Sequence, residues 1–229
     1  MNVRSIVVTG GFGCLGRVVA ASFAARGDKV ARIDFAPSAP DVIEGAIDLG
    51  GIDLVDAAAV DTAVAAVTAE LGGIDVLVNI AGGFTWETLA EGSIDSWERM
   101  FAMNVRSAAT ITKASLPAIT RSKAGRIINI GAASAVQAVS GMGAYAASKA
   151  GVHRLTEALA QELAGSSVTV NAILPSIIDT PGNRADMSDA DRSNWVQPQA
   201  IADVILFLAS PAARSISGAL IPVTRGQPH

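Results

Sequence analysis

Glycines are concentrated in residues 9–16, Thr-Gly-Gly-Phe-Gly-Cys-Leu-Gly, between an apolar run typical of a strand and an alanine-rich run typical of a helix. At that position the spacing Gly11-x-Gly13-x-x-Gly16 predicts a tight turn whose backbone N–H groups and helix N-terminus bind a pyrophosphate. A tight turn without a ligand is the alternative. We predict a nucleotide site formed by Thr9, Gly10, Gly11, Phe12, Gly13, Cys14, Leu15 and Gly16.

Strand-like and helix-like runs alternate along the rest of the chain. Strands are expected at residues 5–9, 29–34, 42–47, 75–79, 126–131, 167–174 and 219–223, and helices at 15–25, 56–71, 94–119, 144–163 and 198–208. This alternation predicts an α/β fold: a single doubly wound, Rossmann-type domain over residues 1–229, with about seven parallel strands and helices on both faces. The polar segment 177–194 is long for a connection between elements, so we expect a substrate lid there.

Composition excludes several classes of function. The net charge is −4 and the basic residues are scattered singly, so no nucleic-acid partner is expected. No apolar run approaches the ~18 residues of a membrane span, so no membrane partner is expected. One cysteine and two histidines, His153 and His229, predict no disulfide and no metal site. A small-molecule substrate and a cytoplasmic location are expected, because a strand begins almost at Met1 and leaves no room for a signal peptide.

The carboxylate of Asp34 indicates which dinucleotide binds. It stands at the end of the second predicted strand, 18 residues after Gly16, where it can accept hydrogen bonds from the adenosine ribose and repel a 2′-phosphate. NAD(H) is therefore the predicted cofactor, and NADP(H) is disfavoured. Two alternatives stay open: Asp34 is a solvated acid at a strand end, or Arg32, on the same side of the strand, reverses the preference.

Tyr145 and Lys149 indicate proton transfer. They are four residues apart in a predicted helix and therefore share one face, where an ammonium can stabilise a tyrosinate. Lowering the phenol pKa from about 10 to about 7 requires roughly 4 kcal/mol, which Lys149 and the cationic nicotinamide of NAD⁺ can supply together. The alternative is an accidental pair on a solvated helix face.

With these residues the chain resembles the short-chain dehydrogenase/reductase family over nearly its whole length. Tyr145 and Lys149 match the family's Tyr-x-x-x-Lys motif. Residues 79–82, Asn-Ile-Ala-Gly, are similar to its Asn-Asn-Ala-Gly element, and residues 175–180 are similar to Pro-Gly-x-x-x-Thr. The glycine loop departs from the common form of small members, which have Gly where Cys14 stands.

The resemblance implies roles for individual residues. Tyr145 would give or take the proton, Lys149 would bind the ribose and lower the phenol pKa, and Asn104 would support a proton relay through water to Lys149. Long helices at 94–119 and 144–163 resemble those that pair subunits in this family, which implies a homodimer or homotetramer. Further cofactor contacts are implied for Asp48, which would meet the adenine, and for Leu49, Asn79, Ala81, Gly82, Pro175, Ile178 and Thr180.

The main departure from the family lies thirteen residues before Tyr145, where Ala132 replaces a serine that holds the substrate oxygen. Losing such a donor costs about 10²- to 10³-fold in rate on a substrate that needs it. Ser134 can face the same side if the strand continues to it, and Ser140 is a looser candidate. Both are otherwise loop residues that contact solvent.

Ala132 also suggests a narrower resemblance, to dihydropteridine reductase, which has alanine there and a similar lid sequence. That resemblance implies a quinonoid dihydropterin as substrate. Thr9, Asn79 and Asn104 resemble the wider family instead. Trp86 and Trp195 are candidate substrate contacts, although Trp195 can equally anchor the lid, and Trp97, within a helix, is expected in the core.

The sequence thus predicts an NAD(H)-dependent oxidoreductase that passes hydride between nicotinamide and a small conjugated, quinonoid or carbonyl substrate, with Tyr145 as proton donor or acceptor. One alternative is an ordinary alcohol or ketone dehydrogenase in which Ser134 or water replaces the missing serine. The other is a non-catalytic NAD-binding sensor.

Overall fold

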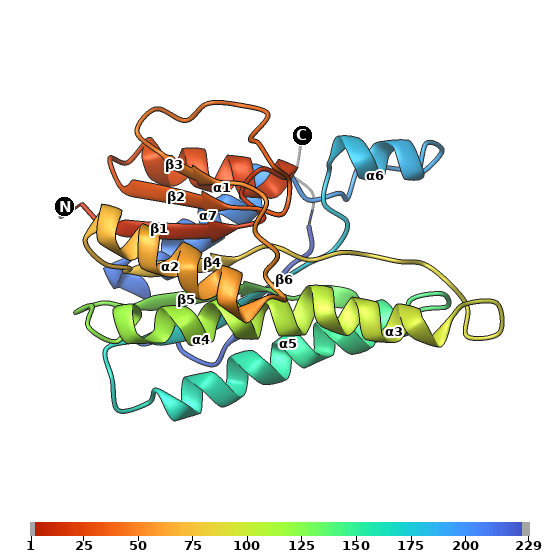
Figure 1. The fold of residues 1–229 in the computed structure, drawn as a ribbon. Helices are drawn as coiled ribbons and strands as arrows, with labels where there is room; N and C mark the ends of the chain where they lie inside the picture. The colour runs from red at the N-terminus through yellow and green to blue at the C-terminus, as the bar shows by residue number, and fades with distance from the viewer. Residues whose placement is uncertain (1–2, 226–229) are drawn as a thin grey trace.

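Seven parallel strands form one sheet in the order β3-β2-β1-β4-β5-β6-β7 in a computed structural model that describes residues 3–225 (Figure 1). His229 lies outside these residues. The predicted α/β, doubly wound fold is confirmed. The strands are β1 (Ser5–Thr9), β2 (Lys29–Ile33), β3 (Ile47–Leu49), β4 (Val76–Asn79), β5 (Arg126–Ile130), β6 (Thr169–Pro175) and β7 (Leu220–Val223).

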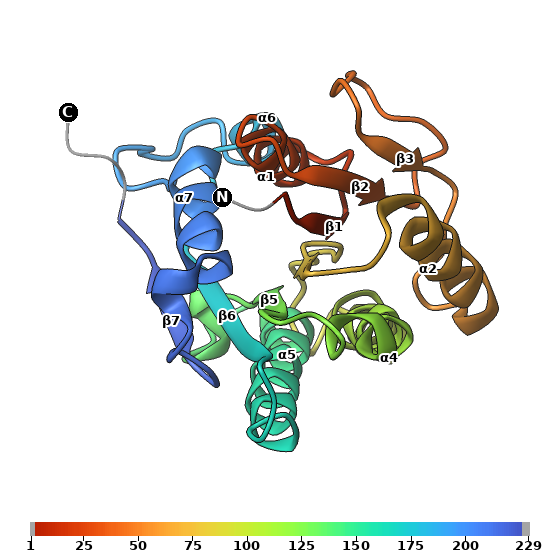
Figure 2. The same cartoon turned by 90° about the vertical axis from the view of Figure 1, so that its left-hand side faces the viewer.

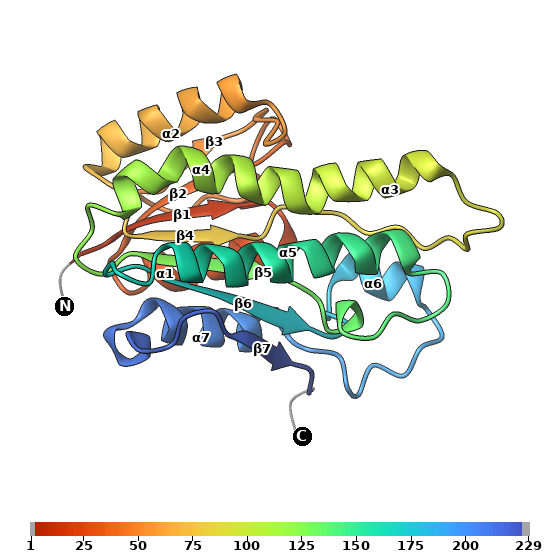
Figure 3. The same cartoon turned by 90° about the horizontal axis from the view of Figure 1, so that it is seen from below.

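Helices cover both faces of the sheet, as the view along the strands shows (Figure 2). One face carries α1 (Cys14–Ala24) and α7 (Pro198–Ala209). The other carries α2 (Ala57–Leu71), α4 (Ser107–Ile119) and α5 (Gly143–Glu162). Two further helices, α3 (Ile94–Phe101) and α6 (Pro181–Asp186), project beyond the carboxyl ends of the strands (Figure 3). Within residues 3–225, no helix combines the length and the apolar character needed to cross a bilayer.

Alternating strand residues supply the two halves of the core. Every residue of β1, β4 and β5 is buried, as expected for central parallel strands. In β1, Ile6 and Val8 belong to the apolar cluster under α1 and α7, whereas Val7 belongs to the cluster under α2 and α4. Successive side chains point to opposite faces, so one continuous apolar run fills both layers.

The predicted strand at 42–47 is wrong. The third strand is Ile47–Leu49, and the chain before it forms an exposed loop. Val42 is 93% exposed, and Gly45 has a φ of +75°, within a turn closed by a hydrogen bond from the Ala46 N–H to the Ile43 carbonyl. Ile43 and Ala46 pack against the core from this loop, but Val42 points to solvent and the segment pairs with no neighbouring strand before Ile47.

The predicted helix at 94–119 is divided. A π-helical turn, η1 (Ala102–Arg106), separates α3 from α4. The predicted lid at 177–194 is also more ordered than a loop, because it contains α6, which the sequence did not suggest. Polar residues and a proline at the first helical position masked a helix of only six residues.

The carboxyl ends of the strands converge at one edge of the sheet. There the chain leaves β1 toward α1 and leaves β4 toward the opposite face, so the two neighbouring strands diverge. Such a switch point is where doubly wound sheets bind nucleotides. The side chains considered below surround this edge, between α6 and the pair α3 and α5 (Figures 1 and 3).

Candidate active site

The glycine-rich loop joins β1 to α1 with no space for side chains at two positions. A Cβ on Gly16 would lie 2.0 Å from the carbonyl oxygen of Gly10, and a Cβ on Gly11 would lie 2.6 Å from the Cβ of Arg32. Gly10 has a φ of +64°, a left-handed conformation that glycine adopts without strain. The sequence requires glycine here for close backbone packing, as the motif predicted.

The N-terminus of α1 fits a pyrophosphate. Gly13 is the N-cap and offers no capping side chain, so the first-turn N–H groups of Cys14, Leu15 and Gly16 remain available. Those groups and the positive helix end together favour an anion. The residues present therefore fit the phosphates of a dinucleotide.

Asp34 lies just beyond β2, beside the glycine loop, with its carboxylate fixed. Its Oδ2 accepts a hydrogen bond from the Phe12 N–H at 2.9 Å, and its Oδ1 accepts one from the Ala36 N–H at 3.0 Å. Both bonds hold the carboxylate without consuming all its lone pairs. Asp34 is thus structured as a preformed acceptor rather than as a freely solvated acid.

Arg32 does not share the space of Asp34. Its side chain is fully buried, donates to both carboxylate oxygens of Asp48 at 2.7 Å, and donates to Asp41 at 2.6 Å. Burial disfavours the charge, but the hydrogen bonds to Asp48 and Asp41 outweigh it and raise the pKa of Arg32. Asp48, implied as an adenine contact, therefore also serves as an ion-pair partner.

Two strand ends next to the glycine-rich loop are held by hydrogen bonds that involve Thr9 and Leu49. The Thr9 hydroxyl is buried and accepts from the N–H groups of Ile80 and Ala81 at 3.1 and 3.2 Å. Leu49 lies at the end of β3, where its carbonyl accepts from the Asp34 N–H at 3.0 Å. The Thr9 hydroxyl and the Leu49 carbonyl thus hold backbone N–H groups of the chain around the predicted nucleotide site.

Tyr145 lies at the start of α5, with the ring of Phe84 against it. The two ring centroids are 4.9 Å apart at an interplanar angle of 77°. Burial raises the pKa of Tyr145 to about 12. The protein's own groups therefore keep the phenol protonated at neutral pH, and the lowering expected from Lys149 is not a property of the protein alone.

Lys149 is buried one helical turn from Tyr145. Its Nζ donates to the carbonyl of Ile130 at the end of β5, at 2.8 Å, and burial lowers its pKa to about 8. The remaining two N–H donors of an ammonium can still meet a ligand. Lys149 is placed at the predicted edge of the sheet, fixed by one backbone bond.

Asn104 sits in the middle of the π-helical turn. Its Oδ1 accepts from the Gly83 N–H at 3.0 Å, and its Nδ2 donates to the Gly83 carbonyl and to the Ser148 hydroxyl, at 3.1 and 2.9 Å. A Cβ on Gly82 would lie 2.4 Å from Asn104 Oδ1 and 3.5 Å from Lys149 Nζ. Asn104 therefore ties the chain after β4 to α5 and lies beside Lys149, where π-helical turns often mark functional sites.

Asn79 supports the site from inside the sheet. Its Nδ2 donates to the Asn129 side chain at 2.8 Å and to the Thr112 hydroxyl at 3.0 Å. Asn79 is 4% exposed, so its side chain cross-links β4, β5 and α4. Ala81 and Gly82 follow it at the loop edge, where a Cβ on Gly10 would lie 2.9 Å from the Ala81 nitrogen.

Ala132 follows β5 in extended conformation and is 4% exposed. The Ala132 N–H donates to Nε2 of His153 at 3.4 Å. His153 lies on α5, one turn after Lys149. Burial and nearby Arg154 lower the pKa of His153, which is consistent with a neutral acceptor nitrogen. Gly131 is required beside it, because a Cβ there would lie 2.5 Å from the same Nε2.

Ser134 does not extend β5. The strand ends at Ile130, and Ala133–Ala135 forms a 3-10 turn closed by a bond from the Ala135 N–H to the Ala132 carbonyl. The condition under which Ser134 would face the same side as Ala132 is therefore not met. Ser140 is exposed, and its carbonyl accepts from the indole N–H of Trp86 at 3.1 Å.

The segment predicted to be a lid is held by an ion pair. Asp179 accepts from Arg184 at 2.7 Å and from the Gln197 amide at 2.6 Å, and the Arg184 and Gln197 bonds lower the pKa of Asp179 to about 2. The Thr180 hydroxyl caps α6 by accepting from the Asn183 N–H at 3.2 Å. Pro175 ends β6, and Ile178 bridges to Val196, so the predicted nicotinamide-side residues lead into a braced lid.

The three tryptophans occupy different environments. Trp86 is 59% exposed, and its ring lies over Gly141, so its role as a substrate contact stays a prediction. Trp195 is 4% exposed with Arg192 over its ring at 5.7 Å, which favours the anchoring role over a stacking surface. Trp97 is 37% exposed, so its expected core position is wrong.

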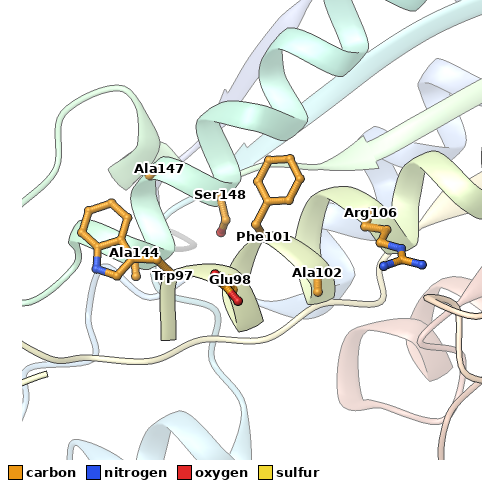
Figure 4. Close-up of a pocket in the computed structure, with 8 residues that line it drawn as sticks. All are labelled: Trp97, Glu98, Phe101, Ala102, Arg106, Ala144, Ala147 and Ser148. Atoms are coloured by element: carbon orange, nitrogen blue, oxygen red, sulfur yellow. The ribbon is translucent and has the colours of Figure 1, made fainter. Parts of the chain in front are cut away.

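Trp97 instead lines a groove between α3 and α5, which we call the α3–α5 groove (Figure 4). Both α3 and η1 pack closely on α5, because Gly143 lies against the Trp97 ring of α3 and Gly151 lies against Val105 of η1. The groove lies on the side of α5 that presents Ser148. Its lining residues are Trp97, Glu98, Phe101, Ala102, Arg106, Ala144, Ala147 and Ser148.

Comparison with known proteins decides the family. A family model described as short chain dehydrogenase matches residues 4–191, which include the glycine loop, Asn104, Tyr145 and Lys149. The chain belongs to this family. The short-chain dehydrogenase described here is accordingly an NAD(P)-dependent oxidoreductase.

The relatives that the chain is similar to are named for different enzyme activities. The chain is 34% identical to 3-oxoacyl-[acyl-carrier-protein] reductase MabA of Mycobacterium tuberculosis, over 97% of this chain and 92% of that protein. It is 32% identical to meso-2,3-butanediol dehydrogenase of Serratia marcescens, over 97% and 94%. The structure of Thermoplasma acidophilum aldohexose dehydrogenase in ligand-free form superposes with a TM-score of 0.87 at 25% identity, over 97% and 92%. These relatives support the wider family, and none of them shows the narrower resemblance to dihydropteridine reductase.

The sequence missed three features of this site. Phe84 beside Tyr145 and His153 under Ala132 carried no motif, and they became visible only when the elements packed together. The ion network around the buried Arg32 was missed too, although two acids, Asp41 and Asp48, follow the strand that carries this arginine. A charged residue inside an otherwise apolar strand was the available signal.

Proposed function

We propose that this short-chain dehydrogenase uses NAD(H) to reduce a small, flat, conjugated or quinonoid substrate. One observation carries the proposal: Tyr145 packs against the exposed ring of Phe84, and Ala132, just after β5, has no side-chain hydroxyl to hold a substrate oxygen. An aromatic wall favours a flat π-system. A conjugated acceptor of the dihydropterin type needs a proton more than it needs polarisation by a serine.

The cofactor preference is argued from the adenosine end. Asp34 is a preformed acceptor for ribose hydroxyls, and its charge repels a 2′-phosphate. Arg32, the cation that could attract that phosphate, is buried and engaged by two carboxylates. NAD(H) is therefore the proposed cofactor over NADP(H).

The chain's own residues divide the reaction between them. A bound nicotinamide supplies or accepts the hydride. Tyr145, protonated at neutral pH, gives the proton when the substrate is reduced, and Lys149 offers its remaining N–H donors to the cofactor ribose. Asn104 binds the backbone N–H and carbonyl of Gly83, so it positions the chain that follows β4 beside Lys149.

An ordinary alcohol or ketone dehydrogenase is the second candidate. The observation in its favour is the similarity to a 3-oxoacyl reductase and a butanediol dehydrogenase at 31–34% identity. In that case water takes the place of the missing serine, since Ser134 lies in a 3-10 turn. The third alternative, a sensor without catalysis, has no support from a site that keeps Tyr145, Lys149 and Asn104.

An assay of the purified protein with NADH and NADPH tests the proposal. Quinonoid dihydropterin, quinones, simple ketones and a 3-oxoacyl thioester serve as substrates, and nicotinamide absorbance serves as the readout. We expect higher kcat/KM with NADH and with the conjugated substrates. Equal or better use of NADPH would refute the cofactor argument, and highest kcat/KM on simple ketones would favour the second candidate.

We further propose that a second copy of the chain covers the α3–α5 groove. Phe101 is 55% exposed and Trp97 is 37% exposed on α3, which is an unusual amount of apolar surface for a helix that faces water. Light scattering is expected to give the mass of two or four chains, and Phe101→Glu is expected to lower it. A monomeric wild-type protein would contradict the proposal.

A cytoplasmic location also stays a proposal, argued from the single cysteine.

A further inference from the structure

Four charged side chains, two arginines and two aspartates, meet beneath the adenosine end of the site. Arg32 of β2 binds Asp48 of β3 through two hydrogen bonds and binds Asp41 of the β2–β3 loop through Nη1. Asp41 also accepts from Nε of Arg17 on α1 at 2.9 Å. One loop carboxylate therefore connects α1, which begins at the phosphate site, with β2, the strand that leads into Asp34.

This network touches the residue that fixes Asp34. The Arg32 guanidinium lies 5.4 Å from the centre of the Phe12 ring, and the Phe12 N–H holds the Asp34 carboxylate. Directly above Arg32 is Gly11, which has no space for a side chain. The cation is thus held immediately under the loop on which a dinucleotide would lie.

Arg32 carries a full charge that would matter if it were not neutralised. It lies on β2, two residues before Asp34, which follows the end of that strand. A guanidinium binds phosphate strongly through paired donors. In the present arrangement its donors to Asp41 and Asp48 are used, and its side chain is 0% exposed. Two carboxylates therefore offset the one cation closest in sequence to the ribose-binding acid.

We propose that Asp41 is a coenzyme-selectivity residue: by holding Arg32 in the buried network, it keeps a phosphate-binding cation away from the adenosine ribose. Asp48 also binds Arg32, but it is an implied adenine contact as well. A substitution at Asp41 therefore changes the hold on Arg32 without removing an adenine contact. The proposal rests on the proposed NAD(H) preference and adds a cause for it beyond Asp34. Asp41 acts through Arg32 and touches no reacting atom.

Asp41→Asn tests this role in the intact protein, with NAD⁺ and NADP⁺ titrated separately by calorimetry. The wild-type ratio of the two Kd values is expected to favour NAD⁺. In the variant that preference is expected to fall by about tenfold, through tighter NADP⁺ binding, because Arg32 keeps one carboxylate instead of two. Asp41 is 28% exposed, so the amide is expected to be tolerated, and Asp41→Ser is a second variant should it fold poorly.

Two controls distinguish the mechanism. Asp203→Asn on α7 removes the same charge from an exposed carboxylate that accepts from Gln199, so its Kd ratio should match that of the wild type. Asp41→Asn combined with Arg32→Met should lose the gain in NADP⁺ affinity. An equal shift in Asp203→Asn, an unchanged ratio in Asp41→Asn, or a gain that persists without Arg32 would overturn the proposal. A wild type that prefers NADP⁺ refutes only the proposed cofactor preference.

Discussion

Tyr145→Phe is expected to lower turnover by about 10²- to 10⁴-fold, the range for a positioned proton donor. Burial raises the pKa of the Tyr145 phenol to about 12, so the phenol is protonated at neutral pH. One N–H of the Lys149 ammonium is already used in a hydrogen bond to the Ile130 carbonyl. Removing the hydroxyl therefore removes the acid while the ring still packs on Phe84. Single-turnover oxidation of NADH measures the loss.

The matched measurement is the affinity for NADH, which should remain close to that of the wild type. Retained turnover would contradict the role of Tyr145. Because the chain has a single tyrosine, tyrosinate absorbance reports this residue alone. It should develop toward pH 12 in the protein by itself, whereas an onset near the ordinary value of about 10 would contradict the effect of burial. Bound NAD⁺ should lower the midpoint, since its nicotinamide is cationic.

Ala132→Ser is expected to raise kcat/KM on simple ketones by up to about 10²-fold and to change it little on a quinonoid substrate. A hydroxyl at this position restores a donor for the substrate oxygen, and a single oxyanion donor affects rates by about this factor. The carbonyl alone needs such polarisation. Rates on the two substrates, compared with NADH as the common cofactor, measure the difference.

Ala133→Ser is the control for this prediction. It adds the same hydroxyl one residue later, inside the 3-10 turn Ala133–Ala135, where it should not reach the substrate oxygen. A comparable gain in both variants would show that the hydroxyl acts through the loop rather than on the substrate. An equal gain on the quinonoid substrate would contradict the idea that this site was built for protonation.

The fold was predictable because its signals are local. The order of strands and helices follows from alternating apolar runs, and the glycine spacing follows from backbone contacts that exclude a Cβ at Gly11 and Gly16. Prediction failed where apolar residues had no partner layer, as at Val42, and where a helix changed its period, as at Ala102–Arg106. Neither failure has a signal within its own window of sequence.

The site was predictable only in part. Motif spacing brought Tyr145, Lys149 and Asn104 to one edge, because helix periodicity and strand ends determine where these residues point. The burial that raises the pKa of Tyr145 and lowers that of Lys149 is a property of the packed elements. The sequence suggested that Lys149 lowers the pKa of the phenol, whereas burial within the protein raises the pKa of Tyr145 to about 12.

By itself the sequence determined a doubly wound sheet, a dinucleotide loop and a Tyr-Lys pair, since each depends on residues close together in the chain. Only the tertiary structure decided what Arg32 does. Asp41 comes from a loop and Asp48 from a strand, and their charges neutralise Arg32 only when those elements pack against β2. Electrostatic partners depend on distances in space, which the order of residues does not give.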